Sequence, residues 1–191
     1  MLKKFIATVL SFTLIFSMAA CGQTSNNSGN KSDNVEVTIP ATFLNEQDKD
    51  VTLDNDAKEK GIKKIKVNKD GSMTVKMSKK AHEEVLSEMK KSLDEEIKAT
   101  LEDKQNFPSF SEITYNKDLT EFSIKVDSEI YGGYDAIYSM VLLLNGGIYQ
   151  SLNSVPDDKL TVIVNIIDQD TGDVIDTINS AQLDESKDTK K

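Results

Sequence analysis

Apolar and polar residues alternate along three short stretches in the first half of the chain, and this period of two predicts β-strands. The first stretch covers residues 35–39 and is closed by Pro40, which has no amide hydrogen to donate to a sheet. The other two flank Asn-Lys-Asp-Gly at residues 68–71, a sequence typical of a tight turn. The pattern therefore predicts a single strand followed later by a hairpin.

Two long helices are predicted by a different spacing. Ser78 is a good helix cap, and the helix it begins is expected to run to about Asp103. Apolar residues recur there at every fourth position, at Ala81, Val85, Met89, Leu93, Ile97 and Leu101. The second long helix is predicted over residues 135–152. A short helix, capped by Thr52 and stopped by Gly61, is expected before the hairpin.

The second half of the chain predicts further hairpins. Residues 113–115 and 122–126 alternate on either side of an Asn-Lys-Asp turn. Residues 160–167 are apolar on both faces, which is typical of a central buried strand. The turn residues 168–173 then lead to a last strand over residues 174–178.

These elements predict an α+β fold: an antiparallel sheet built from hairpins with two main helices packed on one face. Their order is strand, short helix, hairpin-helix, hairpin-helix, hairpin, in a single domain over residues 35–181 with a polar tail over residues 182–191. The segments VNKDGSMTVKMS and YNKDLTEFSIKVD also echo each other. An old duplication and the independent use of similar turn chemistry both account for this echo.

The N-terminus has the pattern of a secretory signal peptide. Two lysines precede residues 5–20, which are uncharged and too short for a bilayer span of about 20 residues. The only cysteine, Cys21, follows in the stretch Met-Ala-Ala-Cys-Gly, which resembles the lipobox of bacterial lipoproteins. The resemblance implies that residues 1–20 are removed and that Cys21 receives a diacylglyceryl group. The alternative is an ordinary signal peptide cleaved near Ala20, with an incidental cysteine.

Residues 21–34 predict a tether. They contain no apolar anchor after Cys21, so this segment cannot bury enough surface to fold and is expected to act as a flexible leash. A single acyl chain holds a protein to a membrane only marginally, whereas a diacylated cysteine supplies two. We therefore expect the chain to be lipid-anchored on the outer, extracytoplasmic face of the cell membrane.

Charge excludes one class of partner and suggests another. The chain has 23 basic residues, all lysine, and 32 acidic ones, for a net charge of -9, which disfavours nucleic-acid binding. Lysines nevertheless concentrate between residues 58 and 80, where Lys64, Lys66 and Lys76 should share one face of the first hairpin. This face is either a basic patch for an anionic cell-wall polymer such as teichoic acid, or a solvated surface balanced by the acidic segment 83–103.

No residue pattern in the chain predicts catalysis, a metal site or a cofactor. The single histidine, His82, has no cysteine or second histidine with which to share a metal, and is expected to face solvent on the long helix. Asp168, Asp170 and Asp173 crowd one turn, but the ligand positions of a calcium-binding EF-hand are not matched. Hairpin turns favour aspartate for backbone reasons, which is the preferred interpretation.

The uncharged stretch between Asp135 and Asp157 leaves several interpretations open. A buried core helix is favoured over a membrane span because polar residues and glycines interrupt it. Gly146 and Gly147 either let another segment approach closely or line a cleft. Four tyrosines cluster around this helix, either on a binding surface or at the edge of the core: Tyr131, Tyr134, Tyr138 and Tyr149.

The mature chain also resembles a group of small lipoproteins of low-GC Gram-positive, clostridia-like bacteria. The stretches that carry the resemblance are VEVTIPATFL, FPSFSEITYNKDLTEFSIKVD, YQSLNSVPDD and VNIIDQDTGDVIDT. Some members of that group are labelled antigen I/II N-terminal-like, which implies adhesion. None of these stretches is a catalytic motif, so the resemblance implies no site residues.

We therefore expect a non-enzymatic binding or adhesion module whose partner is a cell-wall polymer or a host protein or glycan. One alternative is an accessory or small-ligand capture subunit of a cell-envelope complex. Another is a hydrolase of unrecognised type, which would need His82 beside a serine and an acid.

Overall fold

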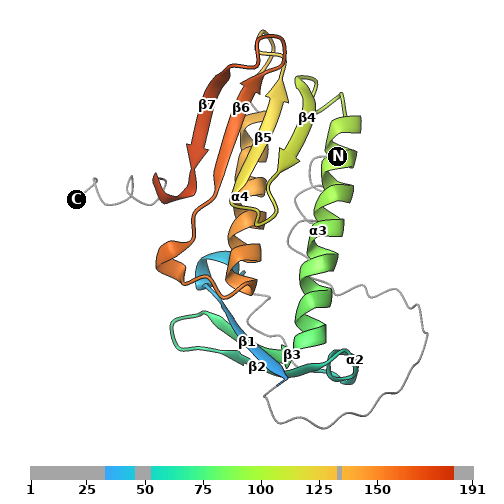
Figure 1. Ribbon diagram of the computed structural model, residues 1–191, viewed down its shortest axis with the longest axis vertical. Helices are drawn as coiled ribbons and strands as arrows, with labels where there is room; N and C mark the ends of the chain where they lie inside the picture. The colour runs from blue at the N-terminus through green and yellow to red at the C-terminus, as the bar shows by residue number, and fades with distance from the viewer. Residues whose placement is uncertain (1–32, 46–52, 133–134, 183–191) are drawn as a thin grey trace. The chain divides into compact units, whose positions relative to one another are not determined.

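A computed structural model describes residues 33–45, 53–132 and 135–182 (Figure 1). From Asp33 onward the chain forms one compact unit. The predicted signal peptide, the lipidation site Cys21 and nearly all of the tether lie outside the described residues, as do Thr52, Tyr134 and most of the polar tail.

Three strands form the first sheet, at the lower end of the unit in Figure 1. They are β1 (Asn34–Ile39), β2 (Ile62–Val67) and β3 (Met73–Ser78), in the order β1-β3-β2 with both pairings antiparallel. The predicted first strand and first hairpin are therefore confirmed. Between β1 and β2 lie the short helices η1 (Ala41–Phe43) and α2 (Asn55–Glu59).

Four strands form the second sheet, in the order β4-β5-β6-β7. They are β4 (Phe110–Tyr115), β5 (Glu121–Val126), β6 (Ile163–Asp168) and β7 (Val174–Asn179). The hairpins β4–β5 and β6–β7 are antiparallel, whereas β5 and β6 are parallel. The crossover between those parallel strands contains the helix α4 (Asp135–Leu152), as such a connection requires.

The α+β class and its two main helices are confirmed, but the hairpins occupy two sheets and one pairing is parallel. The cause of the division is α3 (Lys79–Glu102), which begins directly after β3. Its 24 residues extend about 36 Å along the helix axis, so the second hairpin begins at the end of α3 that is remote from the first sheet. In Figure 1, α4 lies behind the four-stranded sheet and α3 runs beside β4.

Two clusters of buried side chains form the core. The larger joins one face of the four-stranded sheet to both long helices, through residues such as Phe122, Leu93 and Leu142. The smaller lies under the three-stranded sheet, where Val37 and Met77 meet Ala81 and Leu152 together with other buried side chains. Because α3 and α4 contribute to both clusters, the two sheets are packed on the same pair of helices.

The strand β6 is covered on one face only, which corrects the prediction of a strand buried on both. Val164 and Ile166 are completely buried, while Ile163 and Ile167 lie on the opposite face and are partly exposed. The α4 helix is similarly one-sided, because Ile137 is 58% exposed although Leu142 is fully buried. Among the described residues no helix is long and apolar enough to cross a membrane.

The glycine pair of α4 provides close packing, one of the two roles left open by the sequence. A Cβ atom added to Gly146 would lie 2.5 Å from the backbone oxygen of Leu119 and 2.7 Å from Cγ2 of Val162. A Cβ added to Gly147 would lie 2.5 Å from Cζ of Phe43. The turn after β4, the approach to β6 and the helix η1 therefore all rest against a helix surface that has no side chains there.

The two echoing hairpin turns are built alike. The side-chain amide of Asn68 donates to the hydroxyl of Ser72 at 2.9 Å, and that of Asn116 donates to the hydroxyl of Thr120 at 2.7 Å. In both turns the asparagine thus fixes the residue four positions later. This is turn chemistry, which a duplication and independent use explain equally well.

Candidate functional site: the open face of the three-stranded sheet

The strand register brings the three predicted lysines together on one face of the three-stranded sheet. Lys64 of β2 lies opposite Lys76 of β3, and Lys76 lies opposite Glu36 of β1. Two residues further along β2, Lys66 lies opposite Thr74 of β3. The other face of this sheet carries the apolar residues that join the smaller core cluster, so the lysines point away from the core.

These side chains surround a shallow hollow of about 200 Å³, lined by Glu36, Lys64, Lys66, Thr74 and Lys76. Lys64 and Lys66 are exposed, and Lys76 is half-buried. The hydroxyls of Thr38 and Thr74 lie 3.2 Å apart on the same face and add hydrogen-bonding groups beside the lysines. The hollow therefore offers ammonium and hydroxyl groups to a ligand at the surface.

The three lysines form no ion pair with any other described residue. The direct opposition of Lys64 and Lys76 is unfavourable, because like charges on neighbouring strands repel. One acid does lie beside them, since Glu36 is opposite Lys76 and lines the same hollow. The charge of Lys66 also helps to lower the pKa of Asp70.

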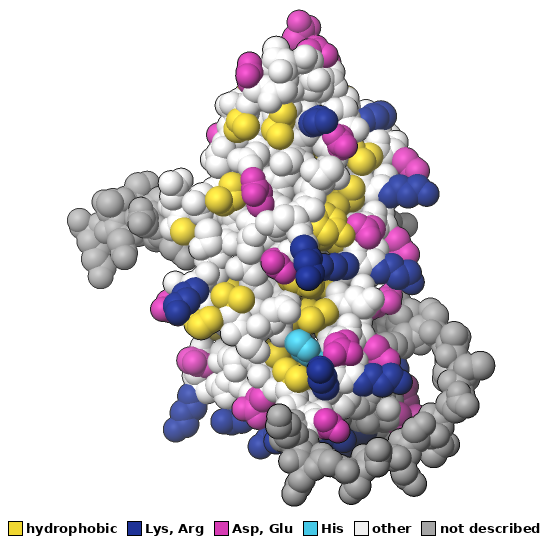
Figure 2. Space-filling view, viewed as in Figure 1, with side chains coloured by type: hydrophobic (Ala, Val, Ile, Leu, Met, Phe, Trp, Pro, Cys, Tyr) yellow, Lys and Arg dark blue, Asp and Glu magenta, His cyan; other side chains and the backbone are white. Residues whose placement is uncertain are grey.

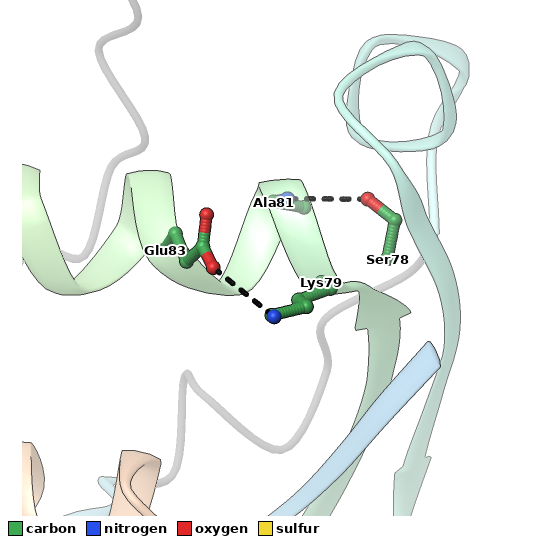
Figure 3. Close-up of polar contacts among 4 residues, drawn as sticks. All are labelled: Ser78, Lys79, Ala81 and Glu83. Carbon is green, nitrogen blue, oxygen red and sulfur yellow. Dashed lines mark hydrogen bonds and ion pairs between the residues drawn. The ribbon is translucent and has the colours of Figure 1, made fainter. Parts of the chain in front are cut away.

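The acidic segment 83–103 does not balance this face by direct pairing. Its acids pair with lysines of α3 itself, for example Glu83 with Lys79 at 3.8 Å (Figure 3) and Glu84 with Lys80 at 3.5 Å. Glu102 likewise pairs with Lys98. The interpretation of the lysine face as a surface neutralised by its neighbour is therefore not supported by contacts.

A second hollow, of about 340 Å³, adjoins the first and shares Glu36 with it. It is bounded by the outer strand β1, by the β2–β3 turn and by the loop after α4. Its walls include the carboxyl groups of Glu36, Asp70 and Asp157 and the hydroxyls of Thr38 and Ser154. Hydrogen bonds from the hydroxyl and the backbone amide of Ser72 lower the pKa of Asp70, so this carboxylate stays charged.

His82 does not face solvent freely, which corrects the sequence prediction. Its Nε2 atom lies 2.7 Å from the backbone oxygen of Leu152, at the end of α4, and the side chain is half-buried. Since a carbonyl oxygen only accepts, Nε2 carries the proton in this contact. The histidine, visible in cyan in Figure 2 beside hydrophobic side chains, ties the start of α3 to the end of α4. The sequence gives no sign of a partner 70 residues away.

Asp168, the last residue of β6, stabilises the turn that follows. Oδ1 of Asp168 accepts hydrogen bonds from the backbone amides of Asp170 and Thr171, at 2.9 and 2.8 Å. Hydrogen bonds from the Ser128 hydroxyl and from the backbone amide of Thr171 lower the pKa of Asp168. Within the described ranges no group of three or more His, Cys, Asp or Glu side chains could hold a metal ion.

The described tyrosines belong mainly to the core edge. Tyr138 is 5% exposed and packs edge-on against Phe107, with ring centroids 5.4 Å apart. Tyr149 is 8% exposed, and the Nζ atom of Lys90 lies 4.8 Å from its ring centre. Burial raises the pKa of Tyr138, which is consistent with a packing role.

Comparison of the chain with protein families, with curated proteins and with solved structures found no match.

Proposed function

We propose that this protein is a non-enzymatic binding module, held by a lipid on Cys21 at the outer face of the cell membrane. Its binding surface is the face formed by Lys64, Lys66 and Lys76, and its ligand is an anionic polymer of the cell envelope. The observation that carries the proposal is the gathering of three lysines, none in an ion pair with another described residue, on an open sheet face of a chain with net charge -9. Such an arrangement costs stability and is useful where an anion is bound.

The chemistry of the face suits a repeating polymer. Lysine ammonium groups act as point charges and do not require the planar geometry that arginine imposes on phosphate or carboxylate groups. Each exposed contact contributes only about 0–1 kcal/mol, so useful affinity needs several anionic groups on one chain. Binding should therefore be reversible and should weaken as salt is added.

The proposed anchor places this face within reach of the envelope. The segment between Cys21 and Asp33 has the composition of a flexible coil, and its 11 residues span at most about 40 Å when extended. A tether of that length lets the domain sample polymer near the membrane while the lipid prevents its loss.

Co-sedimentation of the detergent-solubilised protein with isolated cell walls tests the proposal. The protein should pellet with walls at low salt, and the triple variant Lys64→Gln, Lys66→Gln, Lys76→Gln should remain in the supernatant. The control variant Lys80→Gln, Lys91→Gln, Lys98→Gln removes the same charge from exposed positions of α3 and should still pellet. Equal loss in both variants would mean that only net charge matters and would contradict the proposed site.

Mucin-coated beads provide the second arm of the same experiment. Retention on mucin with no retention on cell walls would replace the envelope polymer by a host glycan or protein, and would favour adhesion. Retention on neither surface would refute the binding of both kinds of polymer.

A further inference from the structure

The strand register arranges the polar side chains on the open face of the three-stranded sheet in two rows. Each row runs across the sheet from the outer strand β2, through β3, to β1. The first row is Lys64, Lys76 and Glu36, and the second is Lys66, Thr74 and Thr38. The chemistry of the face therefore changes across the sheet, from ammonium groups on β2 to a carboxylate and a hydroxyl on β1.

The β2 side of this face carries a pair of cations in line. Lys64 and Lys66 are both exposed, and their Cα atoms lie about 7 Å apart along the strand. Because β2 is an edge strand, no described strand lies beyond them. Past Lys66 the chain turns at Asp70, whose pKa is lowered by hydrogen bonds from Ser72 and, to a smaller extent, by the charge of Lys66. An anionic chain lying along β2 thus meets two adjacent ammonium groups.

The β1 side of the face suits neutral donors and disfavours further anions. Glu36 lies opposite Lys76 and lines the same hollow, but the two side chains form no ion pair. A carboxylate only accepts hydrogen bonds, so Glu36 accepts from a ligand hydroxyl and repels a ligand anion. The hydroxyls of Thr38 and Thr74, 3.2 Å apart, both donate and accept. Hydroxyl groups of a ligand are therefore matched beside the lysine pair.

We infer that the ligand of this face is a polyol phosphate, a polymer whose phosphates alternate with short hydroxyl-bearing spacers. The polymer lies along β2, with neighbouring phosphates against Lys64 and Lys66. Its hydroxyls reach across the sheet to Glu36 and to the two threonines. Lys76, between them, adds a third ammonium group to the phosphate at Lys64. This inference rests on the proposed function and specifies its ligand.

A polyphosphate without spacers fits this face less well, although its charge is denser. It brings more negative charge beside Glu36 and has no hydroxyl from which the carboxylate could accept a hydrogen bond. Lysine stems are flexible, so the spacing of Lys64 and Lys66 selects only weakly between the two polymers. The discrimination therefore depends on Glu36 and Thr38, which favour hydroxyls and disfavour additional anions.

The test compares two probes of equal total charge at one ionic strength, using the full detergent-solubilised protein. The first probe is poly(glycerol phosphate), and the second is linear polyphosphate. We expect poly(glycerol phosphate) to bind about threefold more tightly, since each exposed contact contributes at most about 1 kcal/mol. Equal binding of the two probes, or tighter binding of polyphosphate, would mean that the face only gathers positive charge. That result would overturn the inference and leave the proposed function standing.

Two double variants locate the selectivity. Glu36→Gln, Thr38→Val should reverse the preference, because it removes both the repulsion of extra anions and a hydroxyl partner. The control Glu121→Gln, Thr114→Val makes the same changes at exposed strand positions of the four-stranded sheet and should keep the preference. A preference that is unchanged in Glu36→Gln, Thr38→Val would overturn the inference.

Two further outcomes distinguish the inference from the proposed function and the polymer from a lipid. Binding of neither probe would overturn both the inference and the proposed function. Phosphatidylglycerol added to the detergent micelles presents the same glycerol phosphate group on a lipid. If it binds as tightly as the polymer at equal phosphate concentration, the polymer is not the ligand; weaker binding supports the polymer, which engages both lysines of β2 at once.

Discussion

At the scale of single residues, the stability of the fold depends on two kinds of position: glycines that allow close packing, and a charged side chain in a poorly solvated environment. Gly146 and Gly147 have no Cβ atoms where Leu119, Val162 and Phe43 press against α4. Their presence in a helix costs about 1 kcal/mol each relative to alanine, and the close packing offsets that cost.

Gly146→Ala should therefore destabilise the protein despite the better helix propensity of alanine. Overpacking costs about 1–3 kcal/mol, and the upper end applies because the backbone oxygen of Leu119 cannot rotate away. We expect a net loss of about 2 kcal/mol in the free energy of unfolding by denaturant titration. Ser92→Ala, at an exposed position of α3, is the control and should change stability little. An unchanged or raised stability in Gly146→Ala would show that the packing is looser than described.

Glu96 is a residue whose removal should stabilise the fold. Desolvation raises its pKa above the ordinary 4.5, so the folded state holds the proton more tightly than the unfolded state. Stability therefore falls as the pH rises from 4.5 through the folded pKa, and Glu96→Gln should have a higher Tm than the unaltered protein at pH 7. The difference should shrink as the pH is lowered below 4.5, since both side chains are then neutral. Thermal melts from below pH 4.5 to pH 7 measure the Tm difference between Glu96→Gln and the unaltered protein. The variant Glu95→Gln, at an exposed position, is the control. A Tm at pH 7 that is lowered in Glu96→Gln alone would contradict the prediction.

At the scale of elements, local chemistry decides where each helix and hairpin begins. The hydroxyl of Ser78 accepts a hydrogen bond from the backbone amide of Ala81 at 3.1 Å and so starts α3 (Figure 3). At α2 the cap is Asp54, whose carboxylate accepts from the amide of Ala57 at 2.7 Å. The expected cap Thr52 lies before the described start of this helix.

Ser78→Ala should lower the free energy of unfolding by about 1 kcal/mol, because it leaves an orphan amide at the start of α3. Lys79→Gln is a matched control, since it changes the next residue and removes an exposed ion pair worth at most about 0.5 kcal/mol. Denaturant titration of the two variants compares them. Equal effects would contradict the capping role of Ser78.

Helix starts and hairpin turns could be predicted from the sequence, because residues close together in the chain determine them. The start of α3 follows from its cap Ser78, and the turns at Asn68 and Asn116 follow from their Asn-Lys-Asp sequences. The parallel pairing of β5 with β6 depends on contacts across the α4 crossover, and the bond from His82 to Leu152 joins residues far apart in the chain. Neither leaves a local pattern in the sequence. The lysine face could be predicted because strand alternation alone places Lys64 and Lys66 together.

At the scale of the whole molecule, we propose that a lipid anchor, a tether and a binding face act together. The mass of the N-terminal peptide from membrane-extracted protein tests the anchor. We expect Cys21 to be the first residue and to carry a diacylglyceryl group, and we expect Cys21→Ser to lack both the lipid and the cleavage. An unmodified cysteine within a longer N-terminal peptide would refute lipid anchoring.

The two sheets differ in how the polar groups on their open faces are paired. Both sheets rest on α3 and α4 through buried side chains, and each leaves one face open. On the open face of the four-stranded sheet, Lys125 is paired with Glu112 at 2.6 Å and Asn165 bonds to Glu121 at 2.9 Å. These polar groups are paired with each other, whereas Lys64, Lys66 and Lys76 form no ion pair with a described residue, which is why we propose that binding occurs on the smaller sheet.

Chemical-shift mapping tests this placement most directly. Poly(glycerol phosphate) is titrated into isotope-labelled protein, and the backbone amide signals of both sheets are followed. We expect the largest chemical-shift changes at Lys64, Lys66 and Lys76, and we expect them to disappear at high salt, while the signals of Glu121 and Lys125 hardly change. Changes centred on the four-stranded sheet, or none on β2 and β3, would contradict it.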